Sequence, residues 1–357
     1  MFSKLTEKLN SFLDMGVPFY DCIVMKDGQQ VYRHSNGYTD ANKTKKVTGM
    51  EKYNIYSCSK LITCVSALQL LEKGLFSLDD KLSDYMPEFT QMTVRKGDEI
   101  VSAQTPILIR HLFTMTAGFS YWLESPQILK CKEETNGVCQ TRELMKYLAK
   151  EPLLFEPGER WEYSLCHDVL AALVEVLSGV TFGEYVKKNI FEPLGMKNST
   201  FLLDEKDLEG VINQYGYDVN KGVYERDKRI AYKLGSKYES GGAGCISTVE
   251  DYVKFMEALR LGDIILKKET IDLLATNQLS QEQMESFWDK NYGYGLGQRC
   301  PKDDNKTDFG WEGAAGAYYA IDRKNGITVY LGAHVLSYAT FHNERKKILP
   351  IIQELFK

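Results

Sequence analysis

Two sequence patterns typical of β-hairpins lie near opposite ends of the chain, and the sequence between them is mostly helical. The first hairpin is expected to turn at Asp27-Gly28 and the second at Asn325-Gly326, because these dipeptides between β-rich runs favour tight turns. Hairpins this far apart share a sheet only if the middle of the chain is inserted between them. We therefore predict an α+β fold, with an antiparallel sheet flanked by helices and an inserted helical lobe.

This arrangement divides the chain into two lobes. Residues 1–75 and 235–357 would form a discontinuous sheet lobe and residues 76–234 a mostly helical lobe, with the active site in the cleft between them. A chain of 357 residues exceeds what one compact core usually holds. Residues 204–238 are polar and are expected to form irregular surface structure. Helical patterns run over about 57–73, 107–116, 140–150, 166–178, 182–190 and 248–261.

The N-terminal segment is expected to be an amphipathic helix rather than an export signal. Leu5, Leu9, Phe12 and Leu13 recur at helical spacing among charged residues. No stretch reaches the ~18–20 apolar residues of a membrane span, so we expect a cytoplasmic protein with no membrane partner. The net charge of −5 and the lack of a basic stripe give no reason to expect a nucleic-acid partner.

The eight cysteines are scattered and form no CxxC pair. Buried free thiols are therefore expected rather than a disulfide framework or a zinc site. Cys131 and Cys139 flank a polar loop, and a bridge between them stays open. No HExxH, paired-His or P-loop pattern occurs, so no metal or cofactor is implied. The absence of GxSxG argues against an α/β-hydrolase.

The run Ser57-Cys58-Ser59-Lys60 follows a strand-like segment and opens a long apolar helix. Residues three apart share a helix face, so the Ser57 hydroxyl and the Lys60 amine can meet. A serine becomes a good nucleophile when a base takes its proton, and a lysine can be that base if its surroundings disfavour the ammonium form. The alternative is a plain helix start with Ser57 or Ser59 as its cap.

Two downstream segments supply partners for this pair. Tyr163 stands just before a helix, and a phenol held near positive groups can act as general base and then as acid. Trp311-Glu312-Gly313 leads into a strand and can line the edge of a cleft. Ala314 would then offer its backbone N–H to a developing oxyanion. The alternatives are a core tyrosine and a closely packed, glycine-rich edge strand.

The order of these segments resembles the serine β-lactamase and penicillin-binding protein superfamily, in its class C-like and esterase branch. The family's nucleophile helix is matched by SCSKLITCVSALQLLEKGLF, its HLLTHTSGL segment by RHLFTMTAGF, and its second motif by PGERWEYS. Its late helix entry is matched by GGAGCISTVEDYVKFMEAL, and YGYGLG and the Trp-Glu-Gly hairpin complete the order. The resemblance covers roughly residues 15–340, and the ordered series is far more specific than any single motif.

The resemblance implies a role for each matched position. Ser57 would be the acylated nucleophile, Lys60 its proton acceptor and orienter, and Tyr163 the tyrosine of the family's YxN motif. The oxyanion hole would be the backbone N–H groups of Ser57 and Ala314. Acylation of Ser57 and hydrolysis of the acyl-enzyme by water would then cleave an ester or an amide. Either Lys60 or Tyr163 can be the main base, since such pairs titrate jointly.

Two motifs depart from the family's pattern. Leu165 replaces the Asn of YxN, and His167 or Asp168, one helical turn on, is a candidate substitute. Trp311 and Glu312 replace the Lys and Thr of KTG, a cationic strip that receives the substrate carboxylate in penicillin-recognising relatives. Because Glu312 would repel an anion, we predict weak β-lactam turnover and a preference for neutral or cationic esters or amides.

The expected partner is a small-molecule ester, amide or β-lactam, and the sequence makes no prediction of oligomeric state. Tyr121 and Trp122 follow the HTSGL-like segment and, with Trp311, Glu312 and Gly313, are candidate substrate-binding residues; core packing is the alternative for both aromatics. Two other functions stay open. One is a β-lactamase, a D,D-peptidase or a D-amino-peptidase, in which Glu312 would meet a substrate ammonium. The other is a non-catalytic binding protein that retains the cleft.

Overall fold

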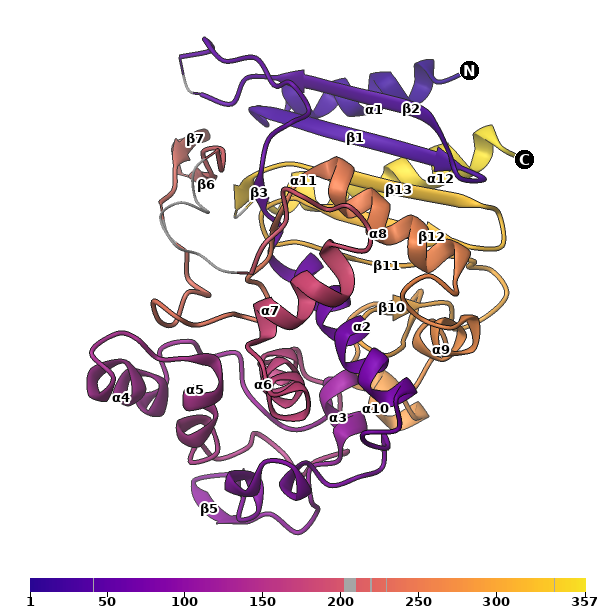
Figure 1. The fold of residues 1–357 in the computed structure, drawn as a ribbon. Helices are drawn as coiled ribbons and strands as arrows, with labels where there is room; N and C mark the ends of the chain where they lie inside the picture. Colours follow the sequence, from indigo (N-terminus) through magenta and orange to yellow (C-terminus); the bar gives the residue numbers. More distant parts are fainter. Residues whose placement is uncertain (41, 202–209, 219, 229, 337) are drawn as a thin grey trace.

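The computed structural model describes residues 1–40, 42–201, 210–218, 220–228, 230–336 and 338–357. Within these residues the main sheet consists of β1 (Phe19–Lys26), β2 (Gln29–Gly37), β9 (Gly293–Tyr294), β10 (Arg299–Cys300), β11 (Phe309–Glu312), β12 (Tyr318–Asp322) and β13 (Ile327–Gly332). Its strand order is β2-β1-β13-β12-β11-β10-β9, and neighbouring strands are antiparallel. β1 pairs directly with β13, so hairpins from opposite ends of the chain share one sheet (Figure 1). The predicted α+β fold is confirmed.

Both hairpins turn where the sequence predicts. Gly28 has a φ of +84° and Gly326 a φ of +63°, left-handed conformations that glycine adopts without the steric cost of a side chain. The backbone N–H of Asp27 donates to the carbonyl of Gly326 at 2.8 Å. This hydrogen bond joins the two turns at one end of the sheet.

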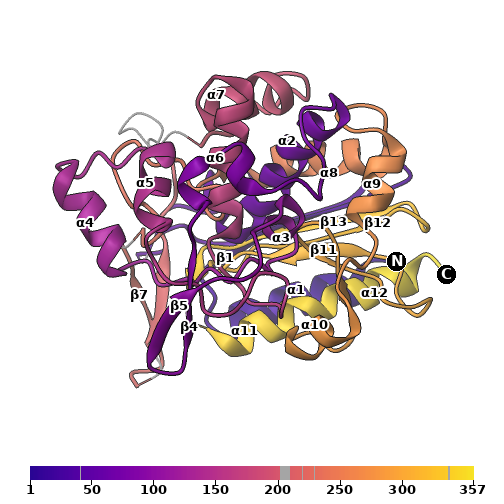
Figure 2. The ribbon, with the colours of Figure 1, turned by 90° about the horizontal axis from the view of Figure 1, so that it is seen from below.

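Helices cover both faces of the sheet, as Figure 2 shows. One face is covered by α1 (Ser3–Asp14), α11 (Ala339–Glu344) and α12 (Ile348–Leu355), and the other by α8 (Val249–Leu261). The side chain of Thr248 accepts a hydrogen bond from a backbone N–H in the first turn of α8, which caps that helix. The sheet is therefore the middle layer of a helix–sheet–helix arrangement.

The terminal helices form where apolar residues recur at helical spacing. Leu5, Leu9 and Phe12 are the fully buried residues of α1, as the sequence pattern predicts. Pro350 lies in the first turn of α12, where its missing N–H removes no helical hydrogen bond. The C-terminal segment is accordingly interrupted by a 3-10 turn at Arg345–Lys347, between α11 and α12.

The middle of the chain is mostly helical, as predicted. The central pair is α2 (Ser59–Glu72) packed against α6 (Cys166–Ser178), and nearly all side chains of α2 are buried. α6 ends at Gly179, which has a φ of +74°. The other helices are α3 (Ile109–Phe113), α4 (Pro126–Glu134), α5 (Thr141–Leu148), α7 (Phe182–Val186) with a π-helical turn at Lys187–Phe191, α9 (Lys268–Leu274) and α10 (Gln281–Ser286).

Short strands occur where the sequence pattern did not indicate them. The segment 204–238, expected to be irregular, contains β6 (Tyr215–Asp218) and β7 (Val223–Arg226), and β6 also pairs with β14 (Val335–Leu336). The prediction is wrong for these strands, because polar composition concealed a brief β-favouring alternation; 202–209, 219 and 229 lie outside the described residues. The remaining strands are β3 (Tyr53–Asn54), β4 (Thr93–Lys96), β5 (Glu99–Ser102) and β8 (Ile246–Ser247).

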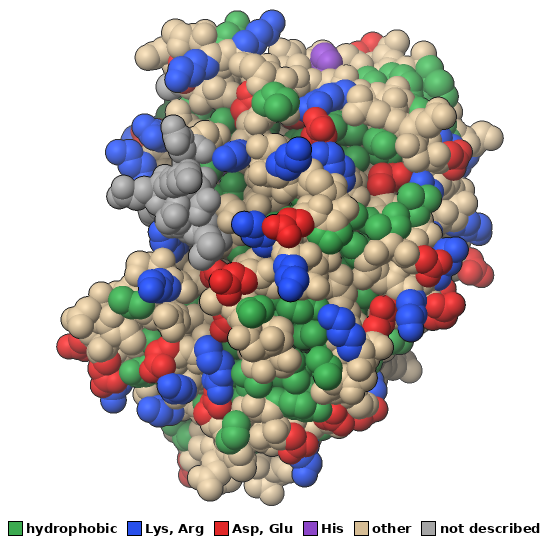
Figure 3. Space-filling view, in the orientation of Figure 1, with side chains coloured by type: hydrophobic (Ala, Val, Ile, Leu, Met, Phe, Trp, Pro, Cys, Tyr) green, Lys and Arg blue, Asp and Glu red, His purple; other side chains and the backbone are tan. Residues whose placement is uncertain are grey.

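The surface carries both signs of charge. On the face in Figure 3, Lys and Arg side chains are interspersed with Asp and Glu. Among the described residues no individual helix has the length and apolar composition of a membrane span, although the bent pair Cys166–Ser178 and Phe182–Leu194 meets both requirements when taken together. The division into a sheet lobe and a helical lobe stays a prediction.

Candidate active site

Ser57 lies on a tight turn immediately before α2. The turn is a 3-10 segment, Tyr56–Cys58, and Tyr56 has a φ of +49°, a conformation that costs energy for a residue with a side chain. The neighbouring Ser59 hydroxyl accepts a hydrogen bond from the backbone N–H of Cys245 at 3.0 Å. The residue at the N-cap of α2 is Cys58, and its side chain makes no cap hydrogen bond. The interpretation of this serine pair as simple helix caps is therefore wrong.

Three predicted side chains converge on one another. The Tyr163 hydroxyl donates to Ser57 Oγ at 2.5 Å, and Lys60 Nζ donates to Ser57 Oγ at 3.4 Å. Lys60 Nζ also donates to the carbonyl of Gly242 at 2.7 Å. A hydroxyl from the 3-10 turn before α2, an amine from α2 and a phenol from the loop before α6 are thereby brought to one point, where a proton can pass between oxygen atoms.

Lys60 is fully buried, yet its surroundings favour the ammonium form. Burial lowers the pKa of Lys60, but attraction to Tyr121, Tyr163 and Asp168 outweighs it and holds the pKa above its ordinary value. Lys60 Nζ lies 4.6 Å from the Tyr163 ring centroid and 5.4 Å from that of Tyr121, within the range of cation–π attraction. The surroundings of Lys60 therefore favour a positive charge beside Ser57.

Aromatic rings hold Tyr163 in place. Tyr121 stacks on the Tyr163 ring with centroids 5.4 Å apart, and Trp311 stacks with centroids 5.9 Å apart. Trp161 and Trp288 contact the same ring at 6.2 and 5.2 Å. Because the ring is packed by these neighbours, its hydroxyl has little freedom to leave Ser57.

Ser57 and Tyr163 line a cavity of about 270 Å³. The predicted cleft-edge residues also line this cavity, and β11 contacts the 3-10 turn that carries Ser57. A Cβ added to Gly313 would lie 2.4 Å from the carbonyl oxygen of Ile55, so only glycine allows this approach. The lining residues are Ser57, Tyr163, Trp288, Asp289, Arg299, Trp311, Glu312, Gly313, Ala314, Arg345 and Lys346.

Tyr121 and Trp122, the two aromatic residues after the HTSGL-like segment, were predicted to bind substrate, but neither lines the cavity. Trp122 is 58% exposed and lines a separate hollow with Leu129 and Glu133, so its predicted place in the cleft is wrong. Tyr121 lies behind Tyr163 and Lys60 rather than in the cavity wall. Its contacts place it as a support for the reacting groups.

Glu312 does not present a free negative charge to the cavity. Its carboxylate accepts hydrogen bonds from Arg345 Nη2 and Lys346 Nζ, each at 2.8 Å. Burial raises the pKa of Glu312, but attraction to the two cations outweighs it, so the pKa lies below its ordinary value. The predicted repulsion of anionic substrates is therefore wrong, because two cations face this one carboxylate.

Sequence reasoning missed five lining residues. Trp288 and Asp289 follow α10, Arg299 is the first residue of β10, and no motif marks any of the three. Arg345 and Lys346 belong to the basic 3-10 turn between α11 and α12. The basic run and the carboxylate of Glu312 were the available signal for an ion pair at the cavity. The two are far apart in the sequence, so their contact in the folded chain could not be predicted from it.

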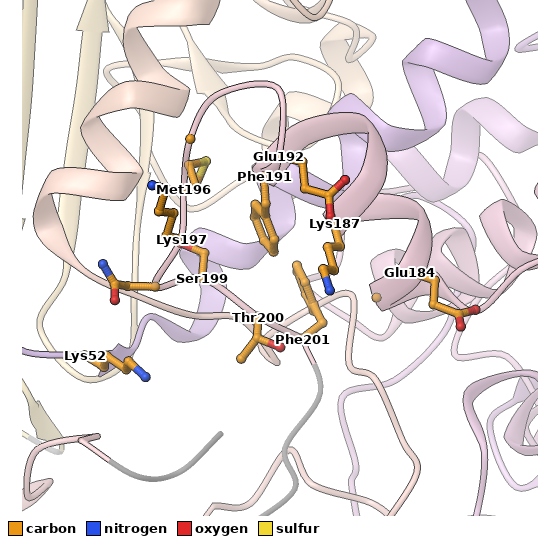
Figure 4. A pocket seen from close by; sticks show the side chains of 13 residues that line it. Lys52, Glu184, Lys187, Phe191, Glu192, Met196, Lys197, Ser199, Thr200 and Phe201 are labelled. Carbon is orange, nitrogen blue, oxygen red and sulfur yellow. The ribbon is translucent and has the colours of Figure 1, made fainter. Parts of the chain in front are cut away.

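A larger hollow of about 680 Å³ lies elsewhere on the molecule (Figure 4). Lys52, Lys187 and Phe191 are among its lining residues, and none of the predicted catalytic side chains is. Its size exceeds that of the Ser57 cavity, but it does not contain the nucleophile–base pair that hydrolysis needs. The chemistry of this chain is therefore assigned to the smaller cavity.

The cysteines are buried free thiols, as expected. Cys131 Sγ and Cys139 Sγ lie 2.6 Å apart without a disulfide bond. In the part of the chain that the structure describes, no group of three or more His, Cys, Asp or Glu side chains is arranged to hold a metal ion.

Comparison with known proteins places these features in context. The Beta-lactamase family model matches residues 20–347 of the chain. Esterase EstB of Burkholderia gladioli is 26% identical over 338 residues, covering 87% of this chain and 84% of that protein. Lovastatin esterase of Penicillium rubens is 28% identical over 347 residues, covering 86% of each.

Solved structures show the same architecture. Simvastatin synthase (LovD) from Aspergillus terreus, in its LovD6 mutant form, superposes with a TM-score of 0.83 at 21% identity, covering 98% of this chain and 96% of that one. At this level of identity the likeness shows the shared fold alone.

Proposed function

The chain belongs to the beta-lactamase family, as an enzyme of its esterase and acyltransferase branch, and we propose that it hydrolyses small-molecule esters through an acyl-enzyme at Ser57. One observation carries the proposal: the Tyr163 hydroxyl and Lys60 Nζ both hydrogen-bond to Ser57 Oγ. This is the arrangement in which a hydroxyl can lose its proton while it attacks a carbonyl carbon.

In acylation, Tyr163 first loses its hydroxyl proton to solvent, and the resulting phenolate takes the Ser57 proton as Oγ bonds to the carbonyl carbon. Lys60 remains an ammonium and favours the negative charge that passes between the two oxygens. The resulting oxyanion would accept hydrogen bonds from the backbone N–H groups of Ser57 and Ala314. Tyr163 then gives its proton to the departing alkoxide, so the ester C–O bond breaks and the alcohol leaves.

In deacylation, the same groups act on water. Tyr163, again a phenolate, takes a proton from a water molecule whose oxygen attacks the acyl carbon. The tetrahedral intermediate collapses, the bond to Ser57 Oγ breaks, and the proton returns to the serine. Tyr163 is therefore the main base in this proposal, since a lysine held as an ammonium has no lone pair to accept a proton.

A direct test locates the acyl-enzyme. The folded protein is treated with a fluorophosphonate probe, and the modified peptide is identified by mass spectrometry. We expect a single adduct on Ser57, together with turnover of p-nitrophenyl butyrate that exceeds turnover of nitrocefin. An adduct on another residue, or fast nitrocefin turnover without ester hydrolysis, would contradict the proposed esterase.

The charges around the cavity predict its substrate preference. Arg345 and Lys346 face Glu312, so an ester with a remote carboxylate should bind better than its cationic counterpart. Because Lys346 is partly exposed, we expect Lys346→Met to raise KM for p-nitrophenyl hemisuccinate by no more than about fivefold, the range of a solvent-screened ion pair. The neutral ester p-nitrophenyl butyrate should be unaffected.

The matched control for this prediction is Lys347→Met. Lys347 is adjacent in sequence, pairs with Glu344 and does not line the cavity. It should leave KM for both esters unchanged. Preference for a cationic ester, or an equal effect of Lys346→Met on the anionic and neutral esters, would show that these cations do not select the substrate.

A further inference from the structure

The position where the family's second motif has asparagine carries no polar side chain here. Leu165 is 2% exposed and stands at the N-cap of α6, where an apolar side chain cannot hydrogen-bond to Lys60. One turn along α6, His167 and Asp168 are both buried. One of these two is expected to supply the missing interaction, because a buried ammonium needs polar neighbours.

His167 is turned toward other partners. Its Nε2 lies 3.6 Å from Cys64 Sγ and 3.4 Å from the carbonyl oxygen of Phe113. Burial and the nearby Lys60 charge lower the pKa of His167 to about 3, so the ring is neutral at any pH at which the enzyme would work. A neutral imidazole with these contacts does not compensate the charge of Lys60.

Asp168 has one carboxylate oxygen that accepts hydrogen bonds and one that has no hydrogen-bond partner among the described residues. Its Oδ1 accepts hydrogen bonds from the Tyr238 hydroxyl and from Ser240 Oγ, both at 2.7 Å. Its Oδ2 is buried and has no hydrogen-bond partner among the described residues. A buried carboxylate oxygen in that state is costly unless a positive charge lies nearby.

Gly242 shows where Oδ2 points. A Cβ placed on Gly242 would lie 2.5 Å from Asp168 Oδ2 and 3.3 Å from Lys60 Nζ. The carboxylate and the ammonium therefore both border the space that a side chain on Gly242 would occupy, and the glycine leaves that space open between them. The carbonyl of the same Gly242 accepts the hydrogen bond from Lys60.

We propose that Asp168 is the positioning residue for Lys60, acting as the buried negative charge that holds the ammonium beneath Ser57 and replacing the asparagine of the second motif. It acts through space on Nζ and through Ser240, because Ser240 Oγ donates to Asp168 and accepts from the Ala243 N–H, fixing the loop that presents the Gly242 carbonyl. The inference rests on the proposed function, in which Lys60 works as a cation.

Several titratable side chains surround Lys60, and each of them can contribute to the pH dependence of the activity. Among the described residues of this set, Asp168 is the carboxylate. The titratable side chains that face Lys60 or feel its charge are Tyr121, Tyr163, Asp168, His167, Cys58, Cys64 and Cys166. Removal of the Asp168 charge should therefore ease loss of the Lys60 proton.

The experiment compares Asp168→Asn with the unmodified protein. Asparagine keeps the size and an oxygen for Tyr238 and Ser240, but it removes the charge. We expect the alkaline limb of kcat/KM for p-nitrophenyl butyrate to move to lower pH by about one to three units, the usual effect of losing an opposite charge nearby. We expect kcat to fall about a hundredfold, the order of loss caused by ~1 Å of misplacement, with KM little changed.

Tyr238→Phe is the matched control, because it removes one hydrogen bond to Asp168 and leaves the charge. Its alkaline limb should stay where it is in the unmodified protein. Gly242→Ala is the second variant and applies if Asp168→Asn does not fold: it separates the two charges with a methyl group and should move the limb in the same direction. Thermal unfolding of each variant verifies that it is folded.

The outcomes are distinguishable. An unmoved limb and an unchanged kcat in a folded Asp168→Asn protein would overturn the positioning role, as would equal shifts in Tyr238→Phe and Asp168→Asn. Labelling of Ser57 by a fluorophosphonate probe is measured in parallel. If the unmodified protein is not labelled there, the proposed function itself fails; if it is labelled, a negative result concerns Asp168 alone.

Discussion

Replacement of Ser57 by alanine is expected to abolish ester hydrolysis while leaving the fold intact. The Ser57 hydroxyl is the atom on which Tyr163 and Lys60 converge, and it is the oxygen that forms the acyl-enzyme in the proposed mechanism. Loss of a nucleophile that acts with its base as a unit lowers kcat by about 10⁴- to 10⁶-fold. Steady-state hydrolysis of p-nitrophenyl butyrate measures the loss, and the mass of the fluorophosphonate-treated variant should show no adduct.

Ser66→Ala is the matched control for that substitution. Ser66 is also a buried serine of α2, but its hydroxyl donates to the Ile62 carbonyl within the helix at 2.9 Å. Its replacement should leave kcat unchanged. Hydrolysis by Ser57→Ala at the rate of the unmodified protein would require a different nucleophile.

The second large effect is expected for Tyr163→Phe. Phenylalanine keeps the ring that packs against Tyr121 and Trp311 and removes the hydroxyl that donates to Ser57 Oγ at 2.5 Å. Loss of a general base typically costs about 10²- to 10⁴-fold in kcat. The rate of the acylation burst should fall with kcat, because proton transfer from Ser57 is the step that loses its acceptor.

Tyr185→Phe provides the comparison. Tyr185 lies on α7, and its buried hydroxyl has no hydrogen-bond partner among the described residues. The control should hydrolyse the ester as the unmodified protein does. If Tyr163→Phe retained its burst rate, Lys60 rather than Tyr163 would have to accept the serine proton.

The parts of the fold that were predictable depend on short-range signals. The Asp27-Gly28 turn and the Asn325-Gly326 hairpin are each determined by a pair of adjacent residues. The sheet that contains strands from both ends of the chain could therefore be expected from sequence. The helix at Cys166–Ser178 was predictable from its apolar spacing. The strands at Tyr215–Asp218 and Val223–Arg226 are only four residues each, too short for an alternation to be distinguished from a polar loop.

The site divides in the same way. Ser57 and Lys60 are separated by one helical turn, and their meeting follows from helix geometry alone. The pairing of Glu312 with Arg345 joins residues 33 positions apart through tertiary structure. No periodicity connects them, so the sequence indicated an isolated carboxylate where the structure has a paired one.

The pairing of β1 with β13 has a consequence for biosynthesis. A ribosome releases Phe19–Lys26 early, but the strand that completes its hydrogen bonding, Ile327–Gly332, follows some three hundred residues later. Until then the β1 edge of the nascent hairpin is open, and an unpaired strand edge is prone to pair with other chains. Trp311 is also synthesised late, so a chain that ends before it would contain Ser57 but lack several residues that line the cavity.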